Sequence, residues 1–441
     1  MAEKNKKTFK MPHTFVIMMV IILFATLLTW IIPAGQYVRV ENADGVKVVD
    51  PNQFSFIDRC PVNPLLIPLY IVNSMCKRVD LMLVIIFSGG AFDLISKSGA
   101  LLSEVARVAK VFQNRLYIFI PIMTTIFALI CTTQGVNQFI AFAPVVVMIT
   151  LAMGLDSIVG AAIILLGGAV GFATGTVNPS TTVVAQKIAE LLSGIQYRAV
   201  CFVVFLIITN IYLVRYALKI RKNPELSPMY DLDSQNEQKD LDIDSFGTMD
   251  VRKTLIIIAL VAALAGIVVG FIAGETPSNM SKLFVEGCKK MLTAAMIIGL
   301  ASAIASIMSA GKIVDTVVYA LASCLRHTPS FFMAPAMYIA NTLINFVIVS
   351  GSGQAAAIMP IMIPVSDLLG VTRQTSVLAY NFGDGFCNYI LPHSTALMGI
   401  ISAVNIPYDR WLKFMWKLFL IWAVTACIMT AIAQGIHLGP M

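Results

Sequence analysis

Residues 350–373 read SGSGQAAAIMPIMIPVSDLLGVTR, and residues 134–157 read QGVNQFIAFAPVVVMITLAMGLDS. Three residue types recur at one spacing of 216 positions: Gln138 with Gln354, Pro144 with Pro360, and Gly154 with Gly370. Further along, VNPSTTVVA (177–185) corresponds to LPHSTALMG (391–399). Because these matches keep their order over a long segment, they indicate an internal duplication of the chain.

The composition around this duplication is that of a membrane protein. Apolar residues make up 58% of the 441 residues and charged residues only 12%, whereas a soluble domain carries roughly a quarter charged residues. The first apolar run, 14–33, has about 20 residues, which is enough to cross a bilayer. The sequence therefore predicts an all-α polytopic membrane protein whose first span is retained.

Basic residues divide the chain into parts. The first ten residues, MAEKNKKTFK, are rich in lysine, and basic residues also flank a polar stretch at 219–253. Lys and Arg collect in cytoplasmic loops of membrane proteins. This bias explains the net charge of +7, so no nucleic-acid partner is predicted. We predict a cytoplasmic N-terminus (1–13), a first repeat (14–218), a cytoplasmic polar linker (219–253) and a second repeat (254–441).

Small and polar residues interrupt the apolar runs at four places, two in each half. They are CTTQGVNQ (131–138), FATGTVNPSTT (172–182), VSGSGQ (349–354) and FGDGFCNYILPHST (382–395). The first and third lie between apolar arms that are too short to cross a bilayer, so each predicts a re-entrant hairpin. The second and fourth lie within longer runs and predict transmembrane helices that are broken in the middle.

Two related halves with broken helices are typical of secondary transporters. Half-helix N-termini offer free N–H groups to an anionic group, and unwound carbonyl and hydroxyl oxygens can hold a cation. The predicted substrate-binding residues are Asn137, Gln138, Asn178, Ser180, Thr181, Ser350, Ser352, Gln354, Asp384, Asn388, His393, Ser394 and Thr395. The residues predicted to couple a cation or proton are Thr133, Gly135, Gly175, Thr176, Gly351, Asp384 and His393.

Asp384 and His393 are the two departures from the duplicated pattern. Asp384 corresponds to a glycine of the first half, Gly168 or Gly171, and His393 corresponds to Ser180. An ionisable residue within a span is costly and marks a functional site by default. We expect Asp384 to recognise a cationic group or a transported proton; the alternative is a carboxylate paired with His393 or with backbone N–H groups.

An enzyme is not predicted. Asp384, His393 and Ser394 are the residue types of a hydrolytic triad, but they stand close together in one broken span without a nucleophile elbow. The eight cysteines show no C-x-x-C pair, so neither a disulfide framework nor a metal site is predicted. Na⁺ is the one cofactor considered, as a coupling ion.

The arrangement of hairpin tip, proline-containing arm and broken span, repeated once, resembles the ion-transporter superfamily of secondary carriers. Three segments are similar to the YfcC-like branch of the DcuC-type anaerobic C4-dicarboxylate carrier family: FKMPHTFVIMMVIILFATLLTWIIPAGQY (9–37), residues 350–386 and PYDRWLKF (407–414). The resemblance covers nearly the whole chain except the linker. It implies inverted repeats and a homodimer, and some members of the branch are associated with basic amino acid exchange.

These observations lead to one substrate class and two alternatives. With no Lys or Arg evident deep in the spans, the sequence favours a basic amino acid, whose carboxylate meets half-helix N-termini and whose side chain meets Asp384. The first alternative is a dicarboxylate or other organic anion coupled to sodium or protons. The second is a channel or a non-transporting membrane subunit. The expected partners are a small-molecule substrate and membrane lipid.

Overall fold

The computed structural model describes most of both halves. The described residues are 14–41, 47–79, 82–83, 85–87, 90–91, 107–112, 114–179, 181–191, 194–234, 276–325, 328–329, 332–368 and 370–439. The predicted cytoplasmic N-terminus (1–13), the second part of the predicted linker, the start of the second repeat and Ser180 lie outside them.

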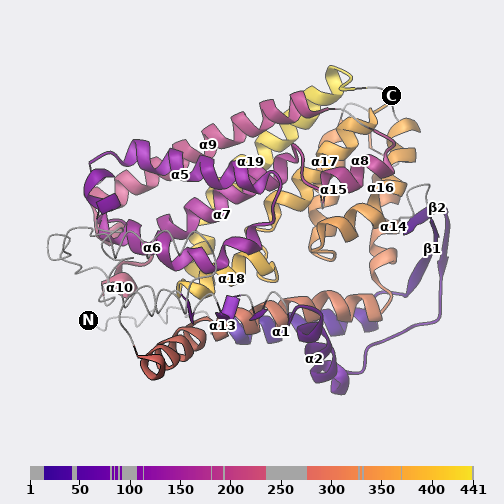
Figure 1. The fold of residues 1–441 in the computed structure, drawn as a ribbon. Helices are drawn as coiled ribbons and strands as arrows, with labels where there is room; N and C mark the ends of the chain where they lie inside the picture. Colours follow the sequence, from indigo (N-terminus) through magenta and orange to yellow (C-terminus); the bar gives the residue numbers. More distant parts are fainter. Residues whose placement is uncertain are drawn as a thin grey trace, which may run out of the picture.

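The described chain is almost wholly helical, which confirms the predicted fold class (Figure 1). The first half contains α1 (Thr14–Ile31), α2 (Ile67–Lys77), α5 (Leu116–Cys131), η2 (Val136–Phe142), α6 (Ala143–Ala152), α7 (Ser157–Thr174), α8 (Thr182–Ile188) and α9 (Ile195–Lys222). The second contains α13 (Pro277–Ala310), α14 (Val314–Leu325), α15 (Met333–Asn345), α16 (Gly351–Leu368), α17 (Arg373–Cys387), α18 (Thr395–Ala403) and α19 (Tyr408–Gly435). Four described helices, α7, α9, α13 and α19, are long and apolar enough to cross a membrane.

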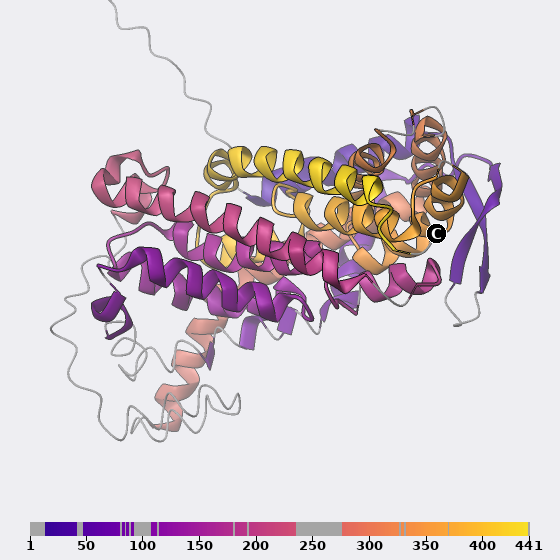
Figure 2. The ribbon, with the colours of Figure 1, turned by 90° about the horizontal axis from the view of Figure 1, so that it is seen from above.

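The polar stretch after α1 forms a β-hairpin, which the sequence did not predict. It consists of the antiparallel strands β1 (Gly35–Glu41) and β2 (Lys47–Phe56), and it projects from one end of the molecule (Figures 1 and 2). The Tyr37 N–H donates to the Asp315 carboxylate at 3.0 Å, and the Thr316 hydroxyl donates to the Pro33 carbonyl at 2.8 Å. The hairpin is therefore attached to α14.

Two helices with buried faces form the centre of the molecule. Nearly every residue of α7 is buried, and so is every residue of α17 except Arg373. α7 packs against α5, α6 and α9, and α17 packs in the same way against α15, α16 and α19. The two central helices also pack on each other, with Gly385 against Ala173 at a distance that leaves no room for a side chain on Gly385.

The long helices α9 and α19 run antiparallel. The Tyr197 hydroxyl, at the start of α9, donates to the Met429 carbonyl near the end of α19 at 2.7 Å. The Tyr212 hydroxyl, further along α9, donates to the Phe414 carbonyl near the start of α19 at 2.6 Å. The sequence similarity of IQYRAV (195–200) to IPYDRW (406–411), through Tyr197 and Tyr408, predicts that α9 and α19 are repeat partners. Inversion requires such partners to run in opposite directions; the repeat relation itself stays a prediction from the sequence.

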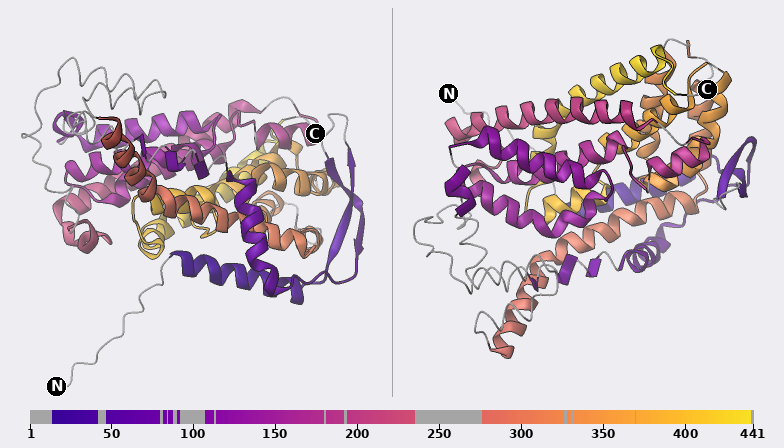
Figure 3. Two further views of the ribbon diagram at one scale, coloured as in Figure 1. Left: turned by 60° about the horizontal axis from the view of Figure 1, so that its bottom comes forward. Right: turned by 45° about the horizontal axis from the view of Figure 1, so that its top comes forward.

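The two predicted hairpins open toward opposite ends of the molecule (Figure 3). The base of the first lies beside the end of α9, where Arg221 donates to Asn114 at 3.0 Å. The base of the second lies beside the end of α19, where the Ala334 N–H bonds to Gln434 at 3.1 Å. Because α9 and α19 are antiparallel, these two bases are at opposite ends.

One boundary differs from the one that the sequence predicts, and residues 278–288 are part of a longer helix. The predicted linker begins at 219 as a polar loop, but α9 continues to Lys222, and a turn, η3 (Pro224–Leu226), and α10 (Tyr230–Asp233) follow. Asp231 of α10 forms an ion pair with Arg410 of α19, so this segment is docked on the helices. Residues 278–288, which are too few to cross a bilayer alone, are the first part of α13, a helix of 34 residues.

Candidate functional site

The two breaks in the central helices are shorter than the sequence predicted. α7 continues to Thr174 and α8 resumes at Thr182, whereas the predicted break was 172–182. α17 continues to Cys387, so the first six residues of the predicted irregular stretch FGDGFCNYILPHST are helical. The broken segments are therefore 175–181 and 388–394. This correction moves Asp384 onto a helix.

Each break meets the hairpin tip of the other half. α18, after the second break, packs on η2 of the first hairpin, and the Thr395 hydroxyl bonds to the Asn137 side chain at 3.3 Å. α8, after the first break, packs on α16 of the second hairpin. A Cβ added to Gly351, the first residue of α16, would lie 2.4 Å from the Thr181 methyl carbon. Tips and breaks thus enclose one region.

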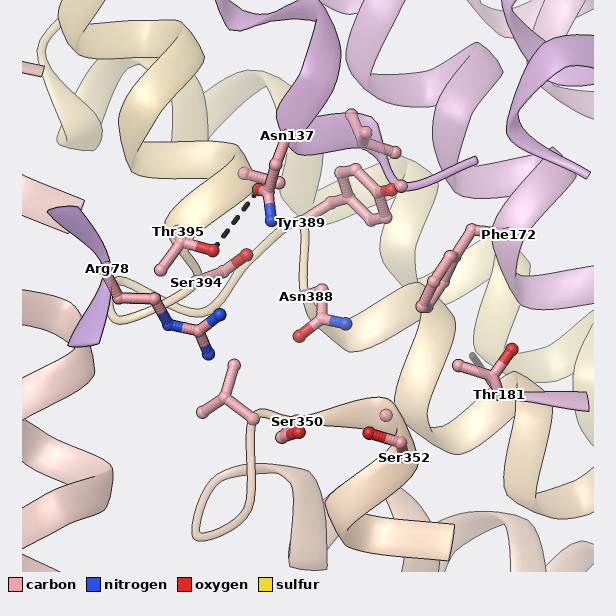
Figure 4. Close-up of a pocket in the computed structure, with 15 residues that line it drawn as sticks. Arg78, Asn137, Phe172, Thr181, Ser350, Ser352, Asn388, Tyr389, Ser394 and Thr395 are labelled. Atoms are coloured by element: carbon pink, nitrogen blue, oxygen red, sulfur yellow. Dashed lines mark hydrogen bonds between the residues drawn. The ribbon is translucent and has the colours of Figure 1, made fainter. Parts of the chain in front are cut away.

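A cavity of about 260 Å³ lies in this region (Figure 4). Both hairpin tips and both breaks contribute to its lining. The lining residues are Arg78, Gly135, Val136, Asn137, Phe172, Thr181, Val349, Ser350, Gly351, Ser352, Asn388, Tyr389, Ser394, Thr395 and Ala396. Of the predicted binding and coupling residues, the structure brings Gly135, Asn137, Thr181, Ser350, Gly351, Ser352, Asn388, Ser394 and Thr395 together here.

Among the described residues, Arg78 is the one charged side chain that lines this cavity. It follows directly after α2, and in Figure 4 its guanidinium points into the space between Thr395 and Ser350. The sequence analysis did not place a Lys or Arg at this site, whereas the structure brings Arg78, an exposed residue outside the candidate spans, to the cavity wall. The sequence did not reveal Arg78 because α2, with only 11 residues, is too short to be recognised as a span. The basic pair Lys77-Arg78 after an apolar run was the available signal.

Helix N-termini also face the cavity. Ser350 precedes α16, and its carbonyl accepts from the Gln354 N–H at 2.7 Å, so the helix begins at the cavity wall. Ser394 precedes α18 in the same way, and its carbonyl accepts from the Met398 N–H at 3.0 Å. The first N–H groups of a helix have no intrahelical acceptor and carry partial positive charge. Together with Arg78 they make the cavity suited to an anionic group.

Asp384 lies behind the cavity wall rather than in the lining. A Cβ added to Gly351 would be 3.0 Å from Asp384 Oδ2, so the carboxylate lies next to the second hairpin tip. Asp384 is 1% exposed, and neither carboxylate oxygen has a hydrogen-bond partner among the described residues. The hydroxyls of Thr176 and Thr181 are likewise buried and unpaired within the described chain. A buried charge without a partner is unfavourable, so this group is expected to bind a proton or another cation.

Several predicted residues lie elsewhere. Thr133 and Gln138 are located on the first tip and do not line the cavity. Gln354 is buried, and its amide donates to the Asn341 carbonyl at 3.0 Å. Asn178 is buried within the first break, where its carbonyl accepts from the Val183 N–H at 3.0 Å.

Gly175 and His393 have distinct places. Gly175 ends α7 in a left-handed conformation with φ of 56°. His393 is 6% exposed and lines a second cavity, of about 230 Å³, which shares Arg78, Ser350 and Thr395 with the first. Its Nε2 atom has no hydrogen-bond partner among the described residues. The predicted pairing of Asp384 with His393 is not among the hydrogen bonds or ion pairs of the described residues.

The second break is held by side chains from neighbouring helices. The Asn345 amide of α15 donates to the Asp384 carbonyl at 2.9 Å and to the Asn388 side chain at 3.0 Å. The Trp411 indole of α19 donates to the carbonyl of Tyr389, which lines the cavity, at 2.9 Å. These contacts fix an irregular backbone inside the protein, as a membrane environment requires.

The comparisons with known proteins agree with a transporter. A family model described as "C4-dicarboxylate anaerobic carrier" matches residues 11–266 and 243–435. The chain is 28% identical to "Putative basic amino acid antiporter YfcC" of Escherichia coli K12, over 93% of this chain and 94% of that one. It is 26% identical to an uncharacterized protein of Haemophilus influenzae, over 94% of this chain and 95% of that one.

The chain is also similar to a solved structure, the Alcanivorax borkumensis YdaH transporter. The TM-score is 0.43 at 15% sequence identity, and the match covers 97% of this chain and 100% of that one. Since the family model matches nearly the whole sequence, the chain belongs to the C4-dicarboxylate anaerobic carrier family of membrane transporters, in the group that includes YfcC.

Proposed function

We propose that this protein is a secondary active transporter that moves a small carboxylate-bearing metabolite by alternating access. The observation that carries the proposal is the cavity between the two hairpin tips and the two breaks, with Arg78 in its wall. The hairpins open toward opposite ends of the molecule, so a substrate held between their tips can be released to either side by movement of one hairpin at a time.

The chemistry of the lining supports a carboxylate as the bound group. Arg guanidinium groups bind carboxylates in a planar, bidentate manner. The N-termini of α16 and α18 add N–H donors, and the hydroxyls of Ser350, Ser352 and Ser394 add further donors. Within the described chain, no acidic residue lines this cavity. A carboxylate would therefore be bound without repulsion from a neighbouring acid.

An organic anion such as a dicarboxylate is the first candidate substrate. The sequence favoured a basic amino acid because no deep Lys or Arg was evident, and Arg78 removes that premise. A basic amino acid is the second candidate, since Asp384 lies next to Gly351, within reach of a cationic side chain if the second tip moves. The name of the Escherichia coli relative also supports this second candidate.

We further propose that Asp384 couples transport to a cation. Its carboxylate is buried and unpaired among the described residues, and Thr181, whose hydroxyl is likewise buried and unpaired, adjoins Gly351 as Asp384 does. Oxygen ligands suit Na⁺, and a carboxylate can alternatively carry a proton. The Gly351 carbonyl accepts from the Tyr380 hydroxyl at 2.5 Å, which ties the second tip to the helix that carries Asp384.

Reconstituted uptake tests the substrate class. Purified protein in liposomes is given labelled succinate or labelled arginine, with and without the unlabelled compound inside. The proposal expects succinate counterflow that Arg78→Gln weakens by about 10- to 100-fold in KM, because a hydrogen bond to a charged group contributes about 1.5–3 kcal/mol. Lys77→Gln, the neighbouring cation that does not line the cavity, is the matched control.

The outcomes separate the alternatives. Arginine counterflow without succinate counterflow, undiminished in Arg78→Gln, would overturn the organic-anion proposal and leave the basic amino acid. Ion conductance without counterflow would indicate a channel.

Imposed gradients test the coupling role. A sodium gradient and a pH gradient are applied separately, and Asp384→Asn is expected to abolish the dependence on whichever gradient drives wild-type uptake. Asp367→Asn, an exposed acid on α16, is the control. Unchanged coupling in Asp384→Asn would refute the role of Asp384.

A further inference from the structure

Three cavities follow one another from the hairpin tips to the β-hairpin. The second cavity shares Arg78, Val349, Ser350 and Thr395 with the first. A third cavity, of about 440 Å³, shares Arg39, Ser309 and Val314 with the second. The shared lining residues make the three cavities a continuous row, which ends beside the β-hairpin.

The charged side chains along this row are mostly cations. Arg78 lines the first two cavities, Arg39 the second and third, and Lys312 the third. The one acid in the described lining, Asp315, is already bound by the Arg39 guanidinium at 3.0 Å and the Tyr37 N–H at 3.0 Å. Among the described residues, Lys312 and Arg78 have no ion-pair partner. The row therefore carries net positive charge over its length.

The fold places these cations close to one another. Lys312 lies between α13 and α14 in a left-handed conformation with φ of 54°, and its carbonyl accepts from the Gly35 N–H at 3.0 Å. This bond joins the start of β1 to the turn that carries Lys312. Arg39 lies further along β1, and its side chain is 44% exposed despite the ion pair. Its remaining N–H donors are thus open to a ligand.

We propose that this row of cavities is an access route for carboxylate anions, and that Arg39 and Lys312 form a first carboxylate subsite at its β-hairpin end. The inference rests on the proposed function and extends it to a second site. Asp315 holds one side of the Arg39 guanidinium, and the incoming carboxylate is bound by the other side together with the Lys312 ammonium. Arg78 is the next cation inward. Clefts lined by one sign of charge raise the local concentration of the opposite ion.

A direct test measures the charge felt by a reagent inside the route. Ser309, which lines both the second and third cavities, is changed to Cys in a full-length background whose exposed Cys60, Cys76 and Cys324 are changed to Ser. The rates of modification by an anionic sulfonatoethyl and a cationic trimethylammonioethyl methanethiosulfonate are measured in neutral detergent. Each rate is divided by that of a free small thiol.

After this normalisation, the anionic reagent is expected to modify the introduced cysteine about ten times faster than the cationic reagent does, since surface potentials reach several kT in such clefts. Lys312→Gln should lower this ratio of rates by about threefold or more, and high salt should lower it further. Lys312→Asn is a second neutralising variant, because asparagine suits the positive φ at this position. Lys222→Gln, at the far end of α9, is the matched control and should leave the ratio unchanged. A ratio near one in the starting protein, or no change in either Lys312 variant, overturns the proposal.

The transport assay separates this inference from the proposed function. Lys312→Gln should raise the KM for the carboxylate substrate and reduce its salt dependence, while kcat stays near that of the starting protein. A positive potential at residue 309 without any carboxylate counterflow would mean that the proposed function fails. Carboxylate counterflow together with equal normalised modification rates, or with a KM that neither Lys312 variant changes, would support the proposed function and refute the subsite.

Discussion

The two breaks in the central helices end those helices by different means. α7 ends at Gly175, whose left-handed backbone turns the chain. α17 ends at Asn388 with ordinary right-handed geometry, and the chain beyond it is held by hydrogen bonds from Asn345, Trp411 and Tyr408. The first break thus turns at a glycine of its own sequence, whereas the second has no left-handed residue at its start and is held by neighbouring helices as well as by its own Asn388 amide.

The same contrast extends to the helices themselves. α7 packs against α5 through Gly171, where an added Cβ would lie 2.0 Å from the Ala128 carbonyl oxygen. α17 packs against α15 through Gly383, and the next residue, Asp384, faces the second hairpin tip instead. A duplicated scaffold can therefore keep its packing glycines in both halves while placing a carboxylate in only one. The buried carboxylate therefore belongs to the second half alone, whereas the first half contributes Arg78 and Asn137 to the cavity lining.

The largest expected effect comes from closing the space at the second tip. Gly351→Ala places a methyl group 2.4 Å from the Thr181 side chain and 3.0 Å from Asp384. Overpacking costs about 1–3 kcal/mol, so uptake should fall by about 5- to 100-fold. Gly135→Ala on the first tip meets nothing within 4 Å among the described residues and should change uptake by less than about twofold. Equal losses in the two variants would contradict the asymmetry between the tips.

The next effect tests the dependence of the second break on its neighbours. Asn345→Ala removes the amide that bonds to the Asp384 carbonyl and the Asn388 side chain. The Asp384 carbonyl keeps the bond from the Asn388 amide at 2.7 Å, so the loss of the Asn345 bonds should lower the free energy of unfolding by about 1–3 kcal/mol, which thermal melting in detergent measures. Thr342→Val, which removes only a side-chain bond to Tyr338 within the same helix, should cost much less. A similar melting temperature for both variants would show that the second break supports itself.

A smaller loss is expected at the first break. Gly175→Ala must adopt a positive φ and brings a methyl group 2.4 Å from the Thr182 hydroxyl and 2.5 Å from the Asn381 amide. We expect a loss of about 2 kcal/mol, of which about 1 kcal/mol is backbone strain. Gly154→Ala also has a positive φ but meets no described atom within 4 Å, so it measures the strain alone. If the two melting temperatures agree, contacts at the first break contribute nothing.

The smallest effect concerns the ion pair between α10 and α19. The Arg410 guanidinium lowers the pKa of Asp231 from 3.8 to about 2. An acid with a lowered pKa contributes stability that is present above its unfolded value and lost as the pH falls toward the folded value. Asp231→Asn should therefore lower the melting temperature slightly at neutral pH, and the difference from the starting protein should shrink below about pH 4. A difference that is independent of pH would refute the ion pair.

The sequence predicted those parts of the site that depend on residue type and repetition. Asn137, Ser350 and Thr395 stand out because polar residues inside apolar runs are costly in a membrane unless they face protein or water, and all three line the cavity. Asp384 stands out for the same reason, but its place behind Gly351 could not be predicted, because α17 stays helical for one more turn than its glycines suggest.

Other parts could not be predicted from local pattern. Arg78 follows a short helix whose position depends on packing against α13, a contact between residues far apart in the chain. Thr133 and Gln138 were predicted at the site, but both are exposed and absent from the cavity lining: the Thr133 hydroxyl donates to the Ile130 carbonyl at 3.1 Å, and Gln138 lies on the 3-10 turn η2. The β-hairpin lies in a stretch whose residues are distinguished only by their polarity. Each of these features depends on tertiary contacts that no single segment records.

Because the Trp411 indole donates a hydrogen bond to the Tyr389 carbonyl, the intrinsic fluorescence of Trp411 can report on the cavity. Trp411 and Trp422 are fully buried, whereas Trp30 and Trp416 are about half exposed. A ligand that shifts Tyr389 changes the polar environment of one buried indole and leaves the other, which bonds to Thr209, as an internal standard. With Trp30 and Trp416 replaced by phenylalanine, emission from the remaining pair can follow occupancy of the cavity without a label.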